Sequence, residues 1–253
     1  MKFDDLDRHM RVYETAHDHR VLPGIWIAAR LDGRNFTRLC RERAKFEAPF
    51  DVRFRDMMVS TAAHLMDCGF KVLYSYTQSD EISLLFDFNI DLFGRKTRKY
   101  NSILSGEASA KFSLLLAEIL EPAPRNGAFN AAGAVCAVFD CRLSQLPAEE
   151  NVIDYFRWRS EDAHRNSLNA HCYWLLRREN KSAEEATAAL EGISTAGKNE
   201  LLFSRGGVNY NDLPAWQKRG AGLFWKDGKI QTDFDLPFAG AYDDYIAQFL
   251  ARE

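Results

Sequence analysis

Three carboxylates stand where two apolar segments begin or end. Asp32 closes the run "IWIAARLD", and the pair Asp80-Glu81 lies inside "TQSDE", just before "ISLLF". Carboxylate oxygens are ligands that Mg²⁺ prefers, and the ion takes few of them, leaving room for waters and phosphates. Judged singly, acidic residues in turns are more often simply solvated. If the two segments meet in space, their carboxylates predict a metal site for phosphoryl transfer.

Basic residues are concentrated near both acidic motifs. One cluster surrounds Asp32, and the second, "GRKTRK", precedes a predicted helix. Because a helix N-terminus attracts phosphate, Arg95, Lys96 and Lys99 are candidates for gripping a triphosphate. A solvated basic linker is an equally good interpretation. With a net charge of −3, nucleic-acid binding would depend on such patches rather than on the total charge. The first cluster comprises Arg30, Arg34, Arg38, Arg41, Arg43 and Lys45.

A third polar cluster lies in "WRSEDAHRN", where Arg159, His164 and Asn166 fall within two helical turns. A histidine on a helix is more often packed or solvated than catalytic, so this cluster alone favours no function. Lys198 and Asn199, in "KNELLF", also carry little signal by themselves.

The order of the predicted elements explains how the carboxylates meet. The sequence predicts helices at 52–68 and 99–120 and strands at 25–32, 70–76, 82–88 and 132–143. This β-α-β-β-α-β order is the ferredoxin-like, split βαβ arrangement of an α+β fold. A right-handed crossover makes the first two strands parallel, with the third paired between them. Asp32 and the turn at Asp80 then lie at the same edge of the sheet.

Beyond residue 147 the sequence favours helices. We predict one at 151–179 and a second that starts after a Ser182 cap and ends at Gly192. A further helix, a loop and a short strand follow, and the last twenty residues are expected to pack on the surface.

Composition fits a globular protein, with 253 residues, 46% apolar and 27% charged. The longest apolar runs are too short for a membrane span, and the polar N-terminus is unlike a signal peptide, so we expect a cytoplasmic location. Five scattered cysteines without a CxxC motif predict free thiols rather than disulfides or structural zinc.

Taken together, the motifs resemble those of the tRNA-His guanylyltransferase family, whose members extend RNA in the 3′-to-5′ direction. The matching stretches run in the family's order from about residue 25 to 226 and include "RLDGRNF", "QSDE", "GRKTRK", "FDCRL", "DYFRWRSEDAHRNSL", "GKNELLF" and "NYNDLP". The resemblance implies a polymerase-like palm at 1–146 and a helical region at 147–253 that completes the nucleotide and tRNA site, the two forming one compact unit.

The resemblance also implies a reaction. ATP, or sometimes GTP, activates the 5′-monophosphate of tRNA, the 3′-hydroxyl of an incoming GTP attacks and releases AMP, and pyrophosphate is removed last. Asp32 and Asp80 would bind two Mg²⁺ ions with the Gly33 carbonyl, and Glu81 would complete the catalytic carboxylates. The implied nucleotide-binding residues are Gly33, Arg34, Asn35, Phe36, Ser79, Arg95, Lys96, Lys99, His164 and Asn166. The implied tRNA-binding residues are Arg30, Arg159, Lys198 and Asn199.

Three departures weaken the inference to strict tRNA-His specificity. The helix motif reads "HRNS" instead of "HINN", Thr37 replaces a His of the eukaryotic pattern, and Ala48 stands where a Lys commonly precedes the proline. These changes suit a relative that repairs 5′-truncated tRNAs by templated addition. A palm-fold nucleotide cyclase and a non-catalytic tRNA-binding protein remain alternatives. The resemblance alone predicts a homotetramer, a dimer of dimers.

Overall fold

The computed structural model describes residues 2–120 and 135–251 and is built around one six-stranded antiparallel sheet. The strand order is β4-β1-β3-β2-β5-β6, and its first four members have the order expected for the ferredoxin-like arrangement, which confirms the predicted α+β class. The strands are β1 (Trp26–Gly33), β2 (Val72–Gln78), β3 (Glu81–Phe86), β4 (Phe139–Leu146), β5 (Ala221–Lys226) and β6 (Lys229–Asp233).

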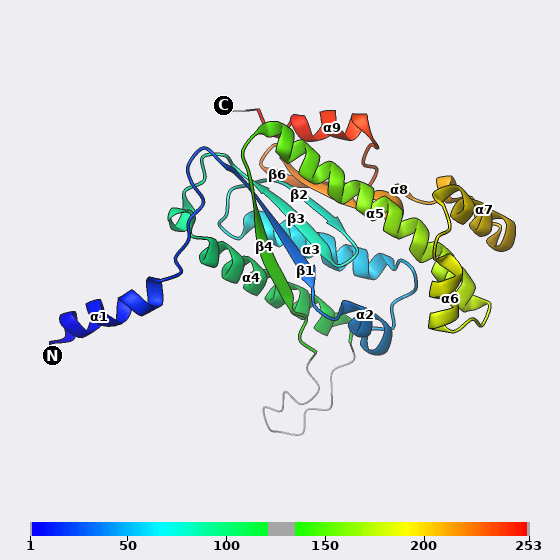
Figure 1. Ribbon diagram of the computed structural model, residues 1–253, viewed down its shortest axis with the longest axis horizontal. Helices are drawn as coiled ribbons and strands as arrows, with labels where there is room; N and C mark the ends of the chain where they lie inside the picture. The colour runs from blue at the N-terminus through cyan, green and yellow to red at the C-terminus, as the bar shows by residue number, and fades with distance from the viewer. Residues whose placement is uncertain (1, 121–134, 252–253) are drawn as a thin grey trace, which may run out of the picture.

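Helices cover both faces of this sheet (Figure 1). The α-helices are α1 (Phe3–Thr15), α2 (Phe36–Arg38), α3 (Val52–Asp67), α4 (Thr97–Ile119), α5 (Glu149–Arg178), α6 (Ala183–Leu190), α7 (Thr195–Gly206), α8 (Ala215–Arg219) and α9 (Gly240–Ala247). A π-helical turn, η1 (Leu39–Arg43), and two 3₁₀ turns, η2 (Leu92–Arg95) and η3 (Tyr210–Asp212), complete the described elements.

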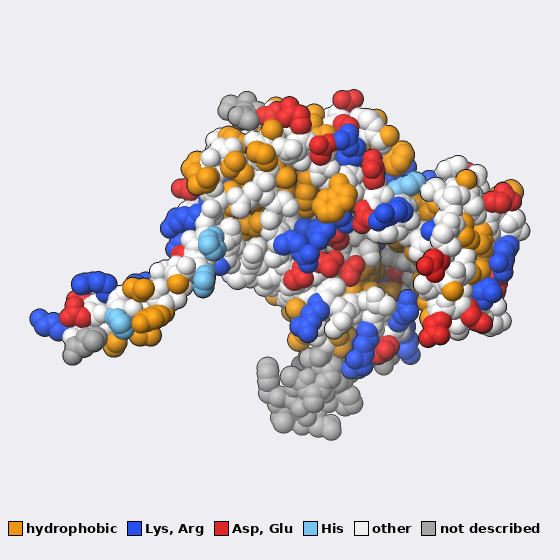
Figure 2. Space-filling view, in the orientation of Figure 1, with side chains coloured by type: hydrophobic (Ala, Val, Ile, Leu, Met, Phe, Trp, Pro, Cys, Tyr) orange, Lys and Arg blue, Asp and Glu red, His pale blue; other side chains and the backbone are white. Residues whose placement is uncertain are grey.

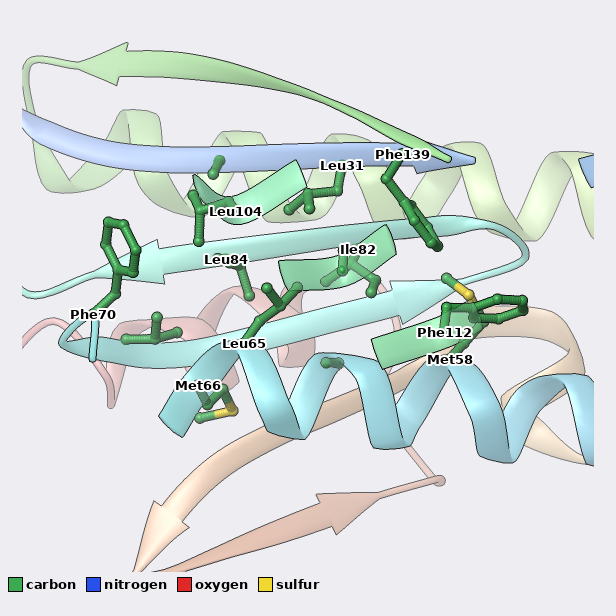
Figure 3. Packing of buried hydrophobic residues seen from close by; sticks show 14 of the residues in the cluster. Leu31, Met58, Leu65, Met66, Phe70, Ile82, Leu84, Leu104, Phe112 and Phe139 are labelled. Atoms are coloured by element: carbon green, nitrogen blue, oxygen red, sulfur yellow. The ribbon is translucent and has the colours of Figure 1, made fainter. Parts of the chain in front are cut away.

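Alternation along β1 divides the core into two layers. Ile27 and Leu31 face α3 and α4, where they pack in the cluster of Figure 3, whereas Trp26 and Ala28 face α5 and α9. Successive side chains of a strand point to opposite faces of the sheet. Because both faces are covered, β1 begins as a continuous apolar run, and its polar residues, Arg30 and Asp32, lie in its second half.

Two strands differ from the sequence prediction. The strand predicted at 132–143 begins at Phe139 and extends to Leu146, because β4 pairs with β1 along its whole length, from Gly33↔Phe139 to Trp26↔Leu146. Residues 132–134 of the prediction lie outside the described residues. The second difference is β6, which was not predicted. It forms a hairpin with β5 through Asp227 and Gly228, which both have positive φ, as an Asp-Gly turn favours.

The C-terminal half wraps around α5. The predicted cap of α6 is present, since the Ser182 hydroxyl accepts a hydrogen bond from the Glu185 N–H and the Glu185 carboxylate accepts one from the Ser182 N–H. The last residues do not simply lie on the surface as expected, because α9 buries Tyr242 and Ile246 against β2 and α5. The N-terminal helix α1, also not predicted, projects from the body and contributes no buried residue within the described part of the chain (Figure 1).

Two predictions from composition can be compared with the structure. All five cysteines are free. Among the described residues, no helix is both long and apolar enough to cross a membrane.

Candidate active site

The end of β1 and the turn between β2 and β3 bring the three predicted carboxylates together. Asp32 is the cross-strand partner of Glu81, and the Gly33 N–H donates a hydrogen bond of 3.0 Å to the Asp80 carbonyl. The turn itself consists of Ser79 and Asp80, with Ser79 at a φ of 54°. The convergence thus follows from the antiparallel register of β3 against both β1 and β2.

Asp32 and Asp80 are not held by a cation of their own among the described residues, although Arg142 lies near enough to Asp32 to interact with it electrostatically. Neither forms an ion pair within the described part of the chain, and the hydroxyl of Ser79 donates to Asp80 at 3.2 Å. Burial, together with the negative charge of Asp32, raises the pKa of Asp80 to about 6. Holding such a carboxylate ionised is costly unless a cation binds. The pair is therefore suited to a divalent cation.

Glu81 differs from these two carboxylates because it is fully paired. Arg159 donates to its two oxygens at 2.7 and 2.8 Å, and Arg30 lies 3.7 Å away. Burial raises the pKa of Glu81, while the hydrogen bonds from Arg159 act in the opposite direction. Its charge is paired inside the protein and links the sheet edge to α5, and the catalytic role that the resemblance implies for it stays a prediction.

Two acidic residues that the sequence analysis did not single out extend the site. Asp140 on β4 is the cross-strand partner of Asp32 and is paired with Arg142 at 3.0 Å. Asp162 on α5 accepts a hydrogen bond of 3.1 Å from Arg159. Asp140 stands in the quoted motif "FDCRL", and pairing of the first and fourth strands was the signal that could have placed it beside Asp32.

A polar cavity of about 280 Å³ opens between the sheet edge and α5. Asp162 and Asn166 face it, one helical turn apart, and the Asn166 amide donates to Asp162 at 3.1 Å. The cavity is lined by Asp32, Tyr76, Gln78, Ser79, Asp80, Glu81, Arg159, Asp162, Ala163 and Asn166. Figure 2 shows acidic and basic side chains gathered on this face, where β1 ends in Figure 1.

A second cavity, of about 330 Å³, lies on the other side of the β2–β3 turn, so that Asp80 lines both. Its walls are mainly apolar and aromatic, with two stacked guanidinium groups. Arg55 lies 4.7 Å from the ring centroid of Trp216, and Arg41 lies 4.9 Å from that of Trp174. Planar walls with cations at the rim suit a nucleobase with attached phosphates.

Comparison with known proteins places the chain in a family. The family model described as tRNAHis guanylyltransferase matches residues 7–147, and the Thg1 C-terminal domain model matches residues 150–242. The chain belongs to the tRNAHis guanylyltransferase family. This confirms the resemblance drawn from the motifs.

Individual relatives agree with the family assignment. A probable tRNA(His) guanylyltransferase of Drosophila melanogaster is 31% identical over 210 residues, covering 83% of this chain and 70% of the relative. The tRNA(His) guanylyltransferase of Neurospora crassa is 33% identical over 207 residues, covering 81% and 68%. A bacterial tRNA(His) guanylyltransferase-like protein in complex with ATP superposes with a TM-score of 0.80 at 26% identity, covering 97% of this chain and 99% of that one.

Three nucleotide-binding residues implied by the family motif are not beside the carboxylates. Arg95 is buried and donates to the Ile25 carbonyl at 2.5 Å, Lys96 pairs with Asp18 at 2.6 Å, and Lys99 lies over the ring of Phe93. Ile25 precedes β1, whose opposite end carries Asp32, roughly 25 Å away for a strand of this length. Within one chain, Arg95, Lys96 and Lys99 therefore lie too far from these carboxylates to share a triphosphate with them.

The predicted nucleotide-binding residues in the loop after β1 do not all present their side chains to the site. The Phe36 ring is buried against Phe112 and Phe139, with centroids 5.0 and 4.9 Å apart, so only its backbone can face a ligand. Gly33 is required there, because a Cβ would lie 2.5 Å from that ring. Arg34 and Asn35 are exposed beside the carboxylates.

The remaining predicted residues divide between the polar cavity and more distant positions. Asn166 lines the cavity, whereas His164 packs between Tyr210 and Phe238, with ring centroids 5.4 and 4.9 Å away. Burial and two nearby cations lower the pKa of His164. Lys198 and Asn199 lie on α7, which contacts α5, and do not line this cavity.

Proposed function

We propose that the protein is a nucleotidyltransferase that adds nucleotides, preferably GTP, to the 5′ end of tRNA in the 3′-to-5′ direction, after ATP activates the 5′-phosphate. The observation that carries this proposal is the pair of uncompensated carboxylates, Asp32 and Asp80, at a sheet edge between two cavities. Two cavities meeting at one carboxylate allow an activating nucleotide and a second reactant to share a reaction centre.

Two Mg²⁺ ions would bind at Asp32, Asp80 and the Gly33 carbonyl. The fit rests on the raised pKa of Asp80 and on the missing ion-pair partners of both aspartates. No group of three or more His, Cys, Asp or Glu suited to a metal occurs among the described residues, and Mg²⁺ is the divalent cation that manages with few protein ligands. When bound, the ions stabilise the attacking and leaving oxygens of an in-line phosphoryl displacement.

The protein's own residues would orient the reactants. The apolar cavity holds the nucleobase of the activating ATP, with Arg41 and Arg55 near its phosphates. Arg159 fixes Glu81 and thereby the distance between α5 and the sheet edge. Asn166 presents its amide on the polar side of the turn, where the incoming nucleotide and the RNA end would meet.

We expect templated repair of 5′-truncated tRNAs rather than strict tRNA-His maturation. Two departures from the family motif, Thr37 and Ala48, line the apolar cavity, and Arg165 and Ser167 belong to the altered helix motif. With such changes, base pairing to the opposite strand would supply the selection. The cytoplasmic location and the homotetramer implied by the resemblance stay predictions.

The test uses 5′-monophosphorylated tRNA lacking its first nucleotide, with Mg²⁺, ATP and labelled GTP. Wild type is compared with Asp80→Ala and with Asp87→Ala, whose carboxylate pairs with Lys71 at the far end of β3. We expect addition by wild type and by Asp87→Ala, on tRNA-His and on an unrelated tRNA truncated opposite a cytosine. Addition only to tRNA-His would favour the maturation enzyme. Consumption of GTP without addition would favour a cyclase, and tRNA binding without metal-dependent turnover a binding protein.

A further inference from the structure

Trp158 on α5 exposes its indole beside the carboxylate site. The residue is 55% exposed, whereas its neighbours Tyr155, Phe156 and Arg159 are all buried. Tryptophan is among the residues that are highly buried on average. A large aromatic side chain held at the surface, next to a site for charged substrates, is typical of a recognition surface.

Two guanidinium groups connect this indole to the catalytic edge. The central carbon of Arg159 lies 4.4 Å from the ring centroid and that of Arg30 lies 5.8 Å from it. Both cations also contact Glu81, the cross-strand partner of Asp32. The indole therefore lies one guanidinium away from the row of carboxylates, and it stands on helix α5 rather than on a loop.

The charges around the indole are those that a phosphate backbone requires. Arg142, which is 54% exposed at its side chain, is the cross-strand partner of Arg30 on β4. Carboxylates alone would repel an RNA end, so cations adjoining them determine from which side a phosphate approaches. Arg30, which also faces Glu81, and Arg142, which also pairs with Asp140, are neighbours across β1 and β4 and form a cationic strip that starts at Trp158.

We infer that Trp158 is a stacking platform for the nucleobase at the 5′ end of the RNA substrate, an inference that rests on the proposed function. An aromatic face beside cations binds bases by stacking, whatever their sequence. The end of an RNA stem offers such a base with one face free. Stacking on Trp158 would place the attached 5′-phosphate at the cationic strip, beside Asp32. Trp158 is thus a positioning residue.

The experiment uses an acceptor-stem hairpin RNA with a 5′-monophosphate and 2-aminopurine at its 5′-terminal nucleotide. Stacking on an aromatic ring quenches 2-aminopurine fluorescence. A second hairpin carries 2-aminopurine in the middle of the stem. We expect wild type to quench only the terminal probe, and Trp158→Ala to abolish this quenching and weaken binding about ten-fold. Trp158→Tyr should retain most of both.

The matched control is Trp225→Ala. Trp225 is also exposed, but its Nε1 donates to the Val72 carbonyl at the far end of β2, so this variant should quench and bind like wild type. Unchanged quenching in Trp158→Ala, or a change of the internal probe instead of the terminal one, would overturn the platform. So would equal losses in Trp158→Ala and Trp158→Tyr, because a tyrosine ring at this position should retain most of the stacking.

The two proposals can fail separately. If wild type adds nucleotides without quenching the terminal probe, the platform is wrong and the proposed function stands. If the terminal probe is quenched through Trp158 by a protein that adds no nucleotide, the platform is supported and the proposed function is wrong.

Discussion

Asp80 is buried and has no ion-pair partner among the described residues. The stability of the metal-free protein should therefore depend on whether the Asp80 carboxyl is ionised. Its pKa of about 6 lies above the ordinary value of 3.8, so the folded chain binds the proton more tightly than the unfolded chain does. Ionisation at neutral pH therefore opposes folding. We predict that Asp80→Asn stabilises the protein in EDTA at pH 7.5 by about 1–3 kcal/mol, since one pKa unit corresponds to about 1.4 kcal/mol.

That stabilisation should shrink as the pH falls through 6 and vanish below 3.8, where the wild-type carboxyl is protonated in both states. Urea denaturation over this pH range measures it. A gain that persists undiminished in acid would show that it arises from packing instead of charge.

The Glu81–Arg159 pair is buried, so removing one of its partners should cost more unfolding free energy than removing a partner of a surface ion pair. The Glu81 side chain is only 14% exposed, so Arg159→Ala leaves a buried carboxylate with Arg30 alone as a cation. We predict a loss of about 3 kcal/mol in the free energy of unfolding. The control is Arg165→Ala, because Arg165 is 75% exposed in its pair with Asp162 and should cost less than about 1 kcal/mol.

Adding Glu81→Gln to Arg159→Ala should recover part of the loss, since the unpaired charge is then removed. Urea denaturation of the two single variants and the double variant at pH 7 gives the comparison. Equal losses for Arg159→Ala and Arg165→Ala would contradict a special role for burial.

At the level of elements, the close approach of β5 to β2 supports the turn that carries Ser79 and Asp80. Gly220 precedes β5 with a φ of 76°, and a Cβ there would lie 2.4 Å from the Thr77 carbonyl. Gly228, in the hairpin turn, has a similar φ of 71° but no described atom within 4 Å of such a Cβ. Substituting an alanine for each glycine therefore distinguishes two costs. Backbone strain arises at both positions, whereas a steric clash next to the site arises only at Gly220.

We predict that Gly228→Ala costs about 1 kcal/mol of unfolding free energy and leaves nucleotide addition unchanged. Gly220→Ala carries the same strain plus the clash, so it should cost more and should lower addition at least ten-fold by displacing Gln78 and Asp80. Denaturation and the addition assay are run on both variants. Similar behaviour of the two would mean that β5 does not position the turn.

The same elements show what the sequence can predict. The meeting of Asp32 with Asp80 followed from strand order, because register alone places both at one edge. The distance of Lys96 from these carboxylates has an equally simple cause. β3 runs from the turn to the opposite end of the sheet. The residues that follow β3, including Lys96, therefore begin at that opposite end. Proximity in sequence to the acidic motif therefore does not imply proximity in space, and the nucleotide-binding role of Lys96 stays a prediction.

Pairing between elements could not be predicted from the sequence. Arg159 has the pattern of an exposed helical arginine, and only its contact with Glu81, seventy-eight residues away, shows that its charge is used internally. The burial of the Phe36 ring could not be predicted either, because it depends on contacts with α4 and β4. The hairpin of β5 and β6, in contrast, was signalled by "KDGK" and overlooked.

For the molecule as a whole, the two ends of the chain contribute very differently to the fold. Helix α9 and the residues after it bury Tyr242, Ile246 and Leu250 over the β2 face of the sheet. Full burial of such side chains contributes about 1.5–3 kcal/mol each, which together approaches the whole stability of an ordinary domain. Helix α1 exposes Phe3, Met10 and Tyr13 and buries no residue in the described structure (Figure 2).

We therefore predict that deleting residues 239–253 abolishes cooperative unfolding or lowers its urea midpoint severely, because Tyr74 and Phe156 lose their cover. Deleting residues 2–16 should leave the unfolding free energy of the chain within about 0.5 kcal/mol of the full-length value. Both deletions are measured by circular dichroism in urea at two protein concentrations. If the N-terminal deletion lowers stability only at the higher concentration, α1 contacts another copy of the chain, since oligomer contacts stabilise by mass action. A loss at both concentrations would instead mean that α1 stabilises its own chain, and the prediction would be wrong.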